Sequence, residues 1–215
     1  MTQKLLFQRF VVFFLASMSF ACLLGQMWNW WSMKTFACLI LPPATAILIF
    51  LAVRAPKNAA MRMWIIEGAV GGVVAAIVYD LFRLPFVLGI VPGLKAMPLF
   101  GVFPRFGQLI LDAPLTDYGA AVQFAGWAYH FSNGAALGIM FLAMLPKATP
   151  RALIIGATIW ALAVEAMLLL SPYYAFFKLK FDSGTFLWIT LSAHLIFGVS
   201  LGAWLSLRLK TKKHA

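Results

Sequence analysis

The sequence predicts an all-α, polytopic integral membrane protein with six transmembrane helices. Of its 215 residues, 63% are hydrophobic and only 11% are charged, which is too little polar surface to cover a soluble domain of this size. Six stretches approach the roughly 20 apolar residues that a spanning helix needs. None of the six shows the alternation of a barrel strand. They run over 10–27, 35–53, 63–83, 120–145, 151–171 and 184–207.

The basic residues are divided unevenly between the two sides of this predicted membrane domain. Eleven of the 17 lie before the first stretch, between the second and third, between the fourth and fifth, at the first position of the fifth, or after the sixth. By the positive-inside rule this side faces the cytoplasm, so both termini are expected there. The net charge of +11 is then explained by orientation and by contact with anionic lipid headgroups. No nucleic-acid partner is expected.

Residues 1–215 are expected to form a single transmembrane domain, in which the first two stretches (1–53) are a peripheral helix pair. The first stretch ends in three tryptophans between 28 and 31, which are typical of the aromatic belt at a membrane interface. The chain begins like a signal peptide, but no small-residue cleavage site precedes these tryptophans, which favours a retained anchor. Pro42 and Pro43 are expected to kink the second stretch or to begin its regular part.

Each of the last four stretches carries an ionisable residue in register with small residues spaced four apart. A spacing of four places such a set on one helical face, and small residues line the faces on which membrane helices pack closely. The ionisable side chains are therefore expected to point into the bundle, at a common depth in its outer half. The sets are Gly68, Gly72, Ala76 and Asp80; His130, Gly134 and Gly138; Ala157, Ala161 and Glu165; and His194, Gly198 and Gly202.

The four-helix core, residues 62–208, also suggests an internal duplication. Asp80 in the third stretch is followed shortly by Pro85, and Glu165 in the fifth is followed by Pro172. The fourth and sixth stretches both read His-x3-Gly-x3-Gly. Because the two helix pairs cross the membrane in the same orientation, we expect a parallel repeat about an axis along the membrane normal.

The connection 84–118 is long and rich in Phe, Leu, Pro and Gly. Its apolar runs are too short to span a bilayer, so an interfacial or re-entrant segment is expected. Such a segment could be a lid over a functional site or a hydrophobic plug at the outer end of the bundle.

Ionisable groups inside spanning helices cost roughly 2.5–3.5 kcal/mol each on insertion scales, so they must pair, bind a ligand or reach water. Asp80 has Arg83 three residues away on its own helix, where the two can form an ion pair. Glu165 has no basic residue within a turn and needs a partner from another helix. His130 and His194 are the obvious partners.

In a first functional role, His130, His194 and Glu165 bind a divalent metal ion, with Asp80 as a fourth ligand or general base. Metal-bound water would then act on a lipid-soluble or periplasmic substrate. Asp80 and Glu165 are the candidate catalytic residues in this role, but whether the protein is an enzyme stays open.

Three alternatives use the same cluster. His130 and His194 could ligate a b-type haem. The cluster could also serve a transporter or proton-coupled carrier. Alternatively, it could be a hydrogen-bonded polar cluster that fixes helix register in a scaffold subunit of a larger membrane complex. The polar residues expected to line the site are Tyr79, Arg83, Tyr129 and Asn133, with Ser132, Thr190 and Ser192.

The last third of the chain contains the run Ala193-His194-Leu195-Ile196-Phe197-Gly198, preceded by a helix from Glu165 to Pro172. In these features it resembles YagU-like bacterial inner-membrane proteins, which are small polytopic proteins of unsettled function with a histidine in similar late helices. The resemblance implies a bacterial inner (cytoplasmic) membrane location and no catalytic role. The chain departs from it around Asp80, Arg83 and Pro85.

Overall fold

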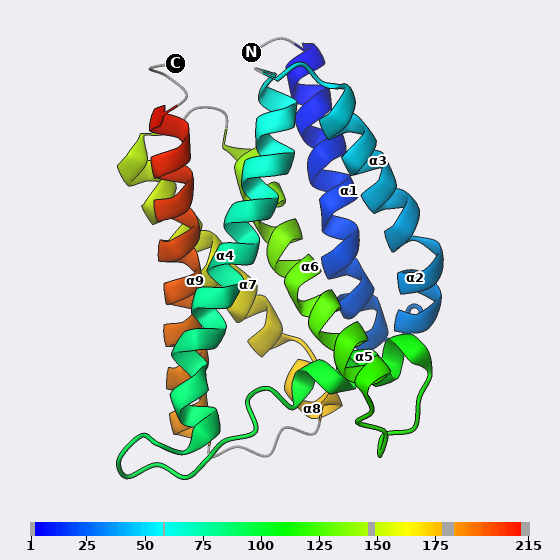
Figure 1. Ribbon diagram of the computed structural model, residues 1–215, viewed down its shortest axis with the longest axis vertical. Coiled ribbons are helices and arrows are strands. Elements are labelled where there is room, and N and C mark those ends of the chain that lie inside the picture. The colour runs from blue at the N-terminus through cyan, green and yellow to red at the C-terminus, as the bar shows by residue number, and fades with distance from the viewer. Residues whose placement is uncertain (1–2, 58, 146–148, 178–182, 212–215) are drawn as a thin grey trace.

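In the computed structural model the chain is helical, and the described residues contain no strand (Figure 1). The structure describes residues 3–57, 59–145, 149–177 and 183–211. The start of α1 and the end of α9 lie at the same end of the bundle (Figure 1), called here the terminal end. The helices are α1 (Gln3–Met27), α2 (Met33–Leu39), α3 (Leu41–Arg54), α4 (Ala60–Leu88), α5 (Val102–Leu111), α6 (Ala120–Met144), α7 (Pro150–Leu170), α8 (Tyr173–Phe176) and α9 (Ser183–Thr211).

The helical membrane fold is confirmed in its main features. Among the described residues, five segments are long and apolar enough to cross a membrane: Gln3–Met27, Met33–Arg54, Ala60–Leu88, Pro150–Leu170 and Gly184–Leu209. They match five of the six predicted stretches. The remaining stretch, 120–145, forms the 25-residue helix α6, which is not among the five. α6 packs against α1, α4 and α5; its Tyr129 is buried and its His130 and Asn133 are half-buried, whereas Ser132 is exposed.

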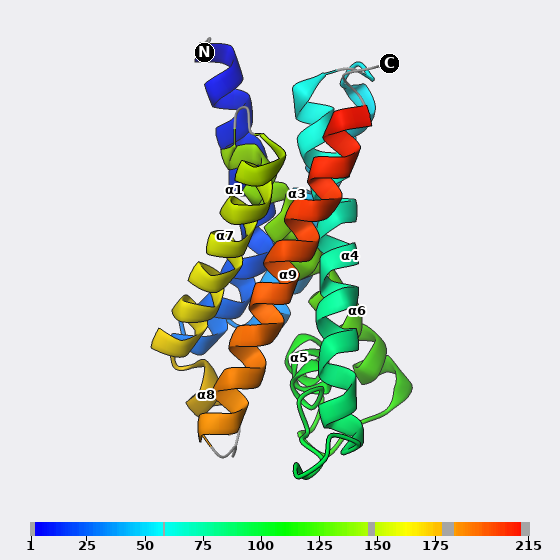
Figure 2. The ribbon, with the colours of Figure 1, turned by 90° about the vertical axis from the view of Figure 1, so that its left-hand side faces the viewer.

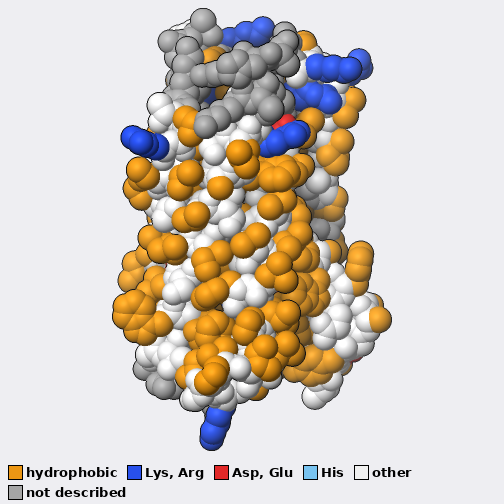
Figure 3. Space-filling model, turned by 60° about the vertical axis from the view of Figure 1, so that its left-hand side comes forward, with side chains coloured by type: hydrophobic (Ala, Val, Ile, Leu, Met, Phe, Trp, Pro, Cys, Tyr) orange, Lys and Arg blue, Asp and Glu red, His pale blue; other side chains and the backbone are white. Residues whose placement is uncertain are grey.

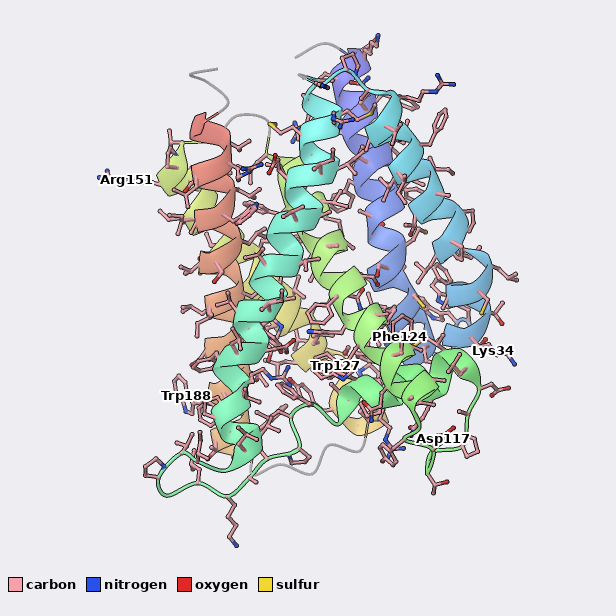
Figure 4. The ribbon with its side chains drawn as sticks, in the orientation of Figure 1. Lys34, Asp117, Phe124, Trp127, Arg151 and Trp188 are labelled. Carbon is pink, nitrogen blue, oxygen red and sulfur yellow. The ribbon has the colours of Figure 1, made fainter. Side chains whose placement is uncertain are left out.

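The surface agrees with a membrane-spanning orientation along the bundle. Figure 3 shows hydrophobic side chains over most of the visible face, with most of the visible Lys and Arg side chains at the terminal end. Arg151, at the start of α7, lies toward that end, whereas Lys34 and Asp117 lie toward the opposite end (Figure 4). Trp188 and Phe124 are 72% and 77% exposed, as expected for side chains that face lipid.

The second predicted stretch is divided at its prolines. α2 ends at Leu39, and α3 begins at Leu41 with proline in its first turn, where the missing N–H has no helical partner to lose. The expectation that the regular helix of this stretch begins near Pro42 is confirmed.

Small residues bring the backbones of α4 and α6 into direct contact. A Cβ atom added to Gly72 would lie 2.0 Å from the carbonyl oxygen of Gly134. One added to Gly138 would lie 2.1 Å from the carbonyl oxygen of Gly68. No side chain fits at these positions. The predicted small-residue face of α4 therefore packs against the predicted small-residue face of α6.

α7 and α9 are joined in the same way. A Cβ atom on Gly198 would lie 2.7 Å from the carbonyl oxygen of Ala157, and one on Gly202 would lie 2.7 Å from that of Leu153. The core therefore consists of two close helix pairs, α4/α6 and α7/α9.

The two pairs meet through α4 and α9. A Cβ atom on Gly71 would come within 2.8 Å of the Trp204 side chain, and Arg208 Nε lies 3.2 Å from Glu67 Oε2. Toward the end opposite the termini, α4 and α9 separate (Figure 2). The space between the pairs at that end holds the site described below.

The connection after α4 differs from expectation at its start. α4 continues through Pro85 to Leu88, and Gly89 follows it in the left-handed conformation with φ 66°. Pro85 lies inside the helix, where it has no N–H to donate to the carbonyl oxygen of Leu81, and α4 ends one turn later. The rest of the predicted segment 84–118 contains α5, which packs against α6 with Gly126 in contact with the Phe103 carbonyl oxygen.

We predict that Gly72→Ala lowers the free energy of unfolding by about 1–3 kcal/mol, the usual cost of overpacking a tight interface. The matched control is Gly156→Ala, because a Cβ atom there would meet Phe141 at an ordinary 3.5 Å. Unfolding in mixed detergent–SDS micelles, followed by circular dichroism, measures both. Equal stability of the two variants would show that α4 and α6 do not touch at this point.

Candidate functional site

Asp80 on α4 has two partners, one on each carboxylate oxygen. Oδ2 lies 2.8 Å from Nε2 of His130 on α6, and Oδ1 lies 3.4 Å from an Nη atom of Arg83 one turn further along α4. The predicted pair with Arg83 is therefore present, and His130 adds a bond across the helix pair. Asp80 is only 8% exposed.

Arg83 is held in place by the connection that follows α4. Its other Nη atom donates a hydrogen bond to the carbonyl oxygen of Leu99. The guanidinium carbon lies 4.7 Å from the ring centre of Tyr79, 5.3 Å from Phe100 and 5.6 Å from Phe103, distances suited to cation–π contact. Arg83 is 4% exposed, and its Nε has no hydrogen-bond partner.

Glu165 on α7 forms the second carboxylate–histidine pair. Its Oε2 lies 3.2 Å from Nδ1 of His194 on α9, and its Oε1 accepts a hydrogen bond from the Tyr174 hydroxyl at 3.3 Å. Burial, and next the charge of Glu165, raise the pKa of Tyr174, so this phenol remains a neutral donor. Glu165 is 1% exposed, and these contacts supply the interhelical partners that it needs.

The surroundings of His194 fix its neutral tautomer. Nδ1 lies 2.9 Å from the carbonyl oxygen of Thr190 as well as near the Glu165 carboxylate. Both neighbours are acceptors, so Nδ1 carries the proton and Nε2 has the lone pair. In His130 the nitrogen held by a carboxylate is Nε2, so the tautomers of the two rings are opposite.

The two pairs border one cavity of about 130 Å³, with His130, His194, Glu165 and Arg83 in its wall. The ring of Tyr79 adjoins both imidazoles, with centre-to-centre distances of 6.3 Å to His130 and 5.1 Å to His194. Asp80 lies behind His130 and Arg83 and does not line the cavity.

The predicted polar lining is only partly reproduced. Tyr79, Arg83 and Asn133 line the cavity. Tyr129 does not, because its hydroxyl donates to the carbonyl oxygen of Ser19 on α1 at 2.7 Å. The Ser19 hydroxyl in turn donates to Asn133 at 2.7 Å. These bonds tie α6 to α1, and α1 also lines the cavity, through Phe20 and Leu23.

The predicted metal ligands are not assembled as a metal site. His130 and His194 each pair with a different carboxylate. Within the described ranges, no group of three or more His, Cys, Asp or Glu side chains could hold a metal ion. The b-type haem alternative does not fit either. An apolar cavity of about 150 Å³ holds one benzene, so a porphyrin is too large for the space beside Tyr79.

Sequence reasoning missed three residues. Trp160 lines the cavity, and its position in mid-span, away from the interfaces that tryptophan usually prefers, was an available signal. Tyr174 lies between the fifth and sixth predicted stretches and was not among the predicted site residues. Glu67 was overlooked as a second carboxylate of its stretch; it is 4% exposed and pairs with Arg208 near the terminal end.

No match to the chain was found among protein families, curated proteins or solved structures. The resemblance to YagU-like proteins therefore stays a prediction, and the function is argued from the site alone.

We predict that Asp80→Asn lowers the free energy of unfolding by about 3–5 kcal/mol, because it leaves the buried Arg83 charge uncompensated. The control is Asp112→Asn, which breaks an ion pair with Lys34 whose side chains are 74% and 54% exposed and should cost less than about 1 kcal/mol. Adding Arg83→Met to Asp80→Asn should recover part of the loss. Similar stabilities of the two single variants in mixed-micelle unfolding would contradict the buried pair.

Proposed function

We propose that the protein binds a lipid-soluble or periplasmic substrate in the cavity between its helix pairs and exchanges protons with it through the two His–carboxylate pairs. One observation carries the proposal: His130, His194 and Glu165 line the same cavity as Arg83, within a wall that is otherwise mainly aromatic and aliphatic. Ligand pockets typically combine such a wall with a few placed polar groups.

The paired imidazoles are suited to proton transfer. A carboxylate bound to one ring nitrogen fixes the tautomer and stabilises the protonated ring, as in acid–base enzymes. The second nitrogen is then the one that exchanges a proton with a ligand: Nδ1 in His130 and Nε2 in His194. The polar part of a substrate would lie near these groups, and its apolar part against side chains such as Phe106 and Leu168.

The proposal includes six membrane spans, with α6 as the span that composition alone does not identify. α6 packs along α4 through glycine contacts, and α7 begins again near the terminal end (Figure 1); both observations support a return of the chain through α6. In each helix pair the carboxylate is on the first helix and the histidine on the second, which supports the parallel repeat.

The basic residues at the terminal end support cytoplasmic termini, contact with anionic headgroups and a bacterial inner-membrane location. The cavity then belongs to the outer half of the bundle.

A proton-coupled carrier is the second candidate, favoured by the duplicated His–carboxylate pairs, since parallel repeats occur in transporters. It requires the contact between Gly71 and the side chains of α9 to open during transport. Substrate binding in the cavity is common to both functions.

We predict that protein purified in mild detergent retains a low-molecular-weight compound that Val164→Trp excludes. Val164 lines the cavity and is 4% exposed, so the indole would fill the space. Ile159→Trp is the control, because this α7 residue is 63% exposed. Mass spectrometry of solvent extracts makes the comparison, with size-exclusion profiles to verify folding.

Leu168→Trp provides a second obstruction of the same wall if Val164→Trp does not fold. Identical extracts from the folded cavity variants and from Ile159→Trp would contradict binding in the cavity.

A further inference from the structure

Two N–H groups from residues of the cavity wall have no acceptor. Arg83 is 4% exposed, and although both its Nη atoms are bonded, its Nε is not. Trp160 lines the cavity from α7, and its buried Nε1 also lacks a partner. Buried donors are nearly always satisfied in proteins. Because Arg83 and Trp160 belong to different helix pairs, a ligand between the pairs that presents acceptors could satisfy both.

Charge and the two unpartnered donors together argue that this ligand is neutral. Arg83 contributes one positive charge, and Asp80 and Glu165 contribute two negative charges, so with neutral imidazoles the described cluster sums to +1 − 2 = −1. An anionic headgroup would enter a site that is already negative. A cation would match the charge but could not accept hydrogen bonds from Arg83 or Trp160. A neutral group with acceptor oxygens meets both conditions.

Size and lining favour a single planar ring. The cavity of about 130 Å³ is close to the engineered cavity of about 150 Å³ that holds one benzene. Aromatic side chains surround it, among them Phe103, Phe106 and Phe186. Offset stacking and edge contacts with such rings are favourable for a flat ligand.

We infer that the cavity binds the head ring of a membrane quinone, whose carbonyl oxygens accept hydrogen bonds from Arg83 Nε–H and Trp160 Nε1–H. This inference rests on the proposed function and names the substrate class of the same site. The inference concerns only how the quinone ring is bound. The isoprenoid or alkyl tail of the quinone would lie among apolar side chains.

The test uses the full chain in lipid nanodiscs and three probes with the same tail: a decyl-substituted para-benzoquinone, decylbenzene and decyl phosphate. Isothermal titration calorimetry should show saturable quinone binding, with decylbenzene and decyl phosphate at least about tenfold weaker. Trp160→Phe keeps the aromatic ring and removes the donor, so it should weaken quinone binding by about 2–10-fold. Trp204→Phe is the matched control, because it removes an equally buried, unpartnered N–H that does not line the cavity.

Each contrary result has a distinct meaning. Tighter binding of decyl phosphate, or equal binding of decylbenzene, would overturn the quinone class and leave substrate binding in the cavity standing. Quinone binding that Trp160→Phe does not weaken would overturn the assigned donor. Failure of all three probes would overturn the inference, and the proposed function would fail as well only if Val164→Trp also released no bound compound.

Discussion

The direct backbone contact within each helix pair is the constraint on which the rest of the structure depends. Where Gly72 meets Gly134, the backbones of the two antiparallel helices are too close for any side chain, which favours the observed register. One turn beyond the contact of Gly134 with Ala76, that register places Asp80 opposite His130. The Gly198 contact does the same for His194 and Glu165. Glycine packing thus determines which imidazole meets which carboxylate, and a slip of one residue would leave both carboxylates facing other groups.

The two helix pairs pack closely near the terminal end and separate at the other end. The ionisable groups of the site are therefore buried in the bundle, and His130, His194 and Glu165 also border a cavity. The pairs satisfy the charges, which would otherwise be costly inside a membrane. A buried polar cluster with a purely structural role would need the same His–carboxylate pairs. It would not need a cavity beside them, and the cavity wall would not need an arginine and a tryptophan with N–H groups that lack an acceptor. These two features favour the proposed binding site over a cluster that only fixes helix register.

The sequence was sufficient to predict five of the spans, the small-residue faces and the meeting of ionisable groups, because each depends on composition or on a spacing of four along one helix. It could not predict which histidine pairs with which carboxylate, since that depends on how the helices are arranged around one another. For the same reason the expected three-ligand metal site is not found among the described residues: His130 and His194 are similar in sequence context but pair with separate carboxylates. Tyr129 was misplaced because its helix face is covered by α1, a neighbour that periodicity does not identify.

Nitrogen-15 NMR of histidine-labelled protein in bilayers, recorded at about pH 8, where neutral imidazole predominates in unperturbed histidine, tests the paired arrangement most directly. The chain has only three histidines, so His130→Gln and His194→Gln assign the signals. The account predicts a proton on Nε2 of His130 and on Nδ1 of His194, with Asp80→Asn shifting only the first signal and Glu165→Gln only the second. Identical tautomers, or signals that do not respond to their own carboxylate, would contradict it.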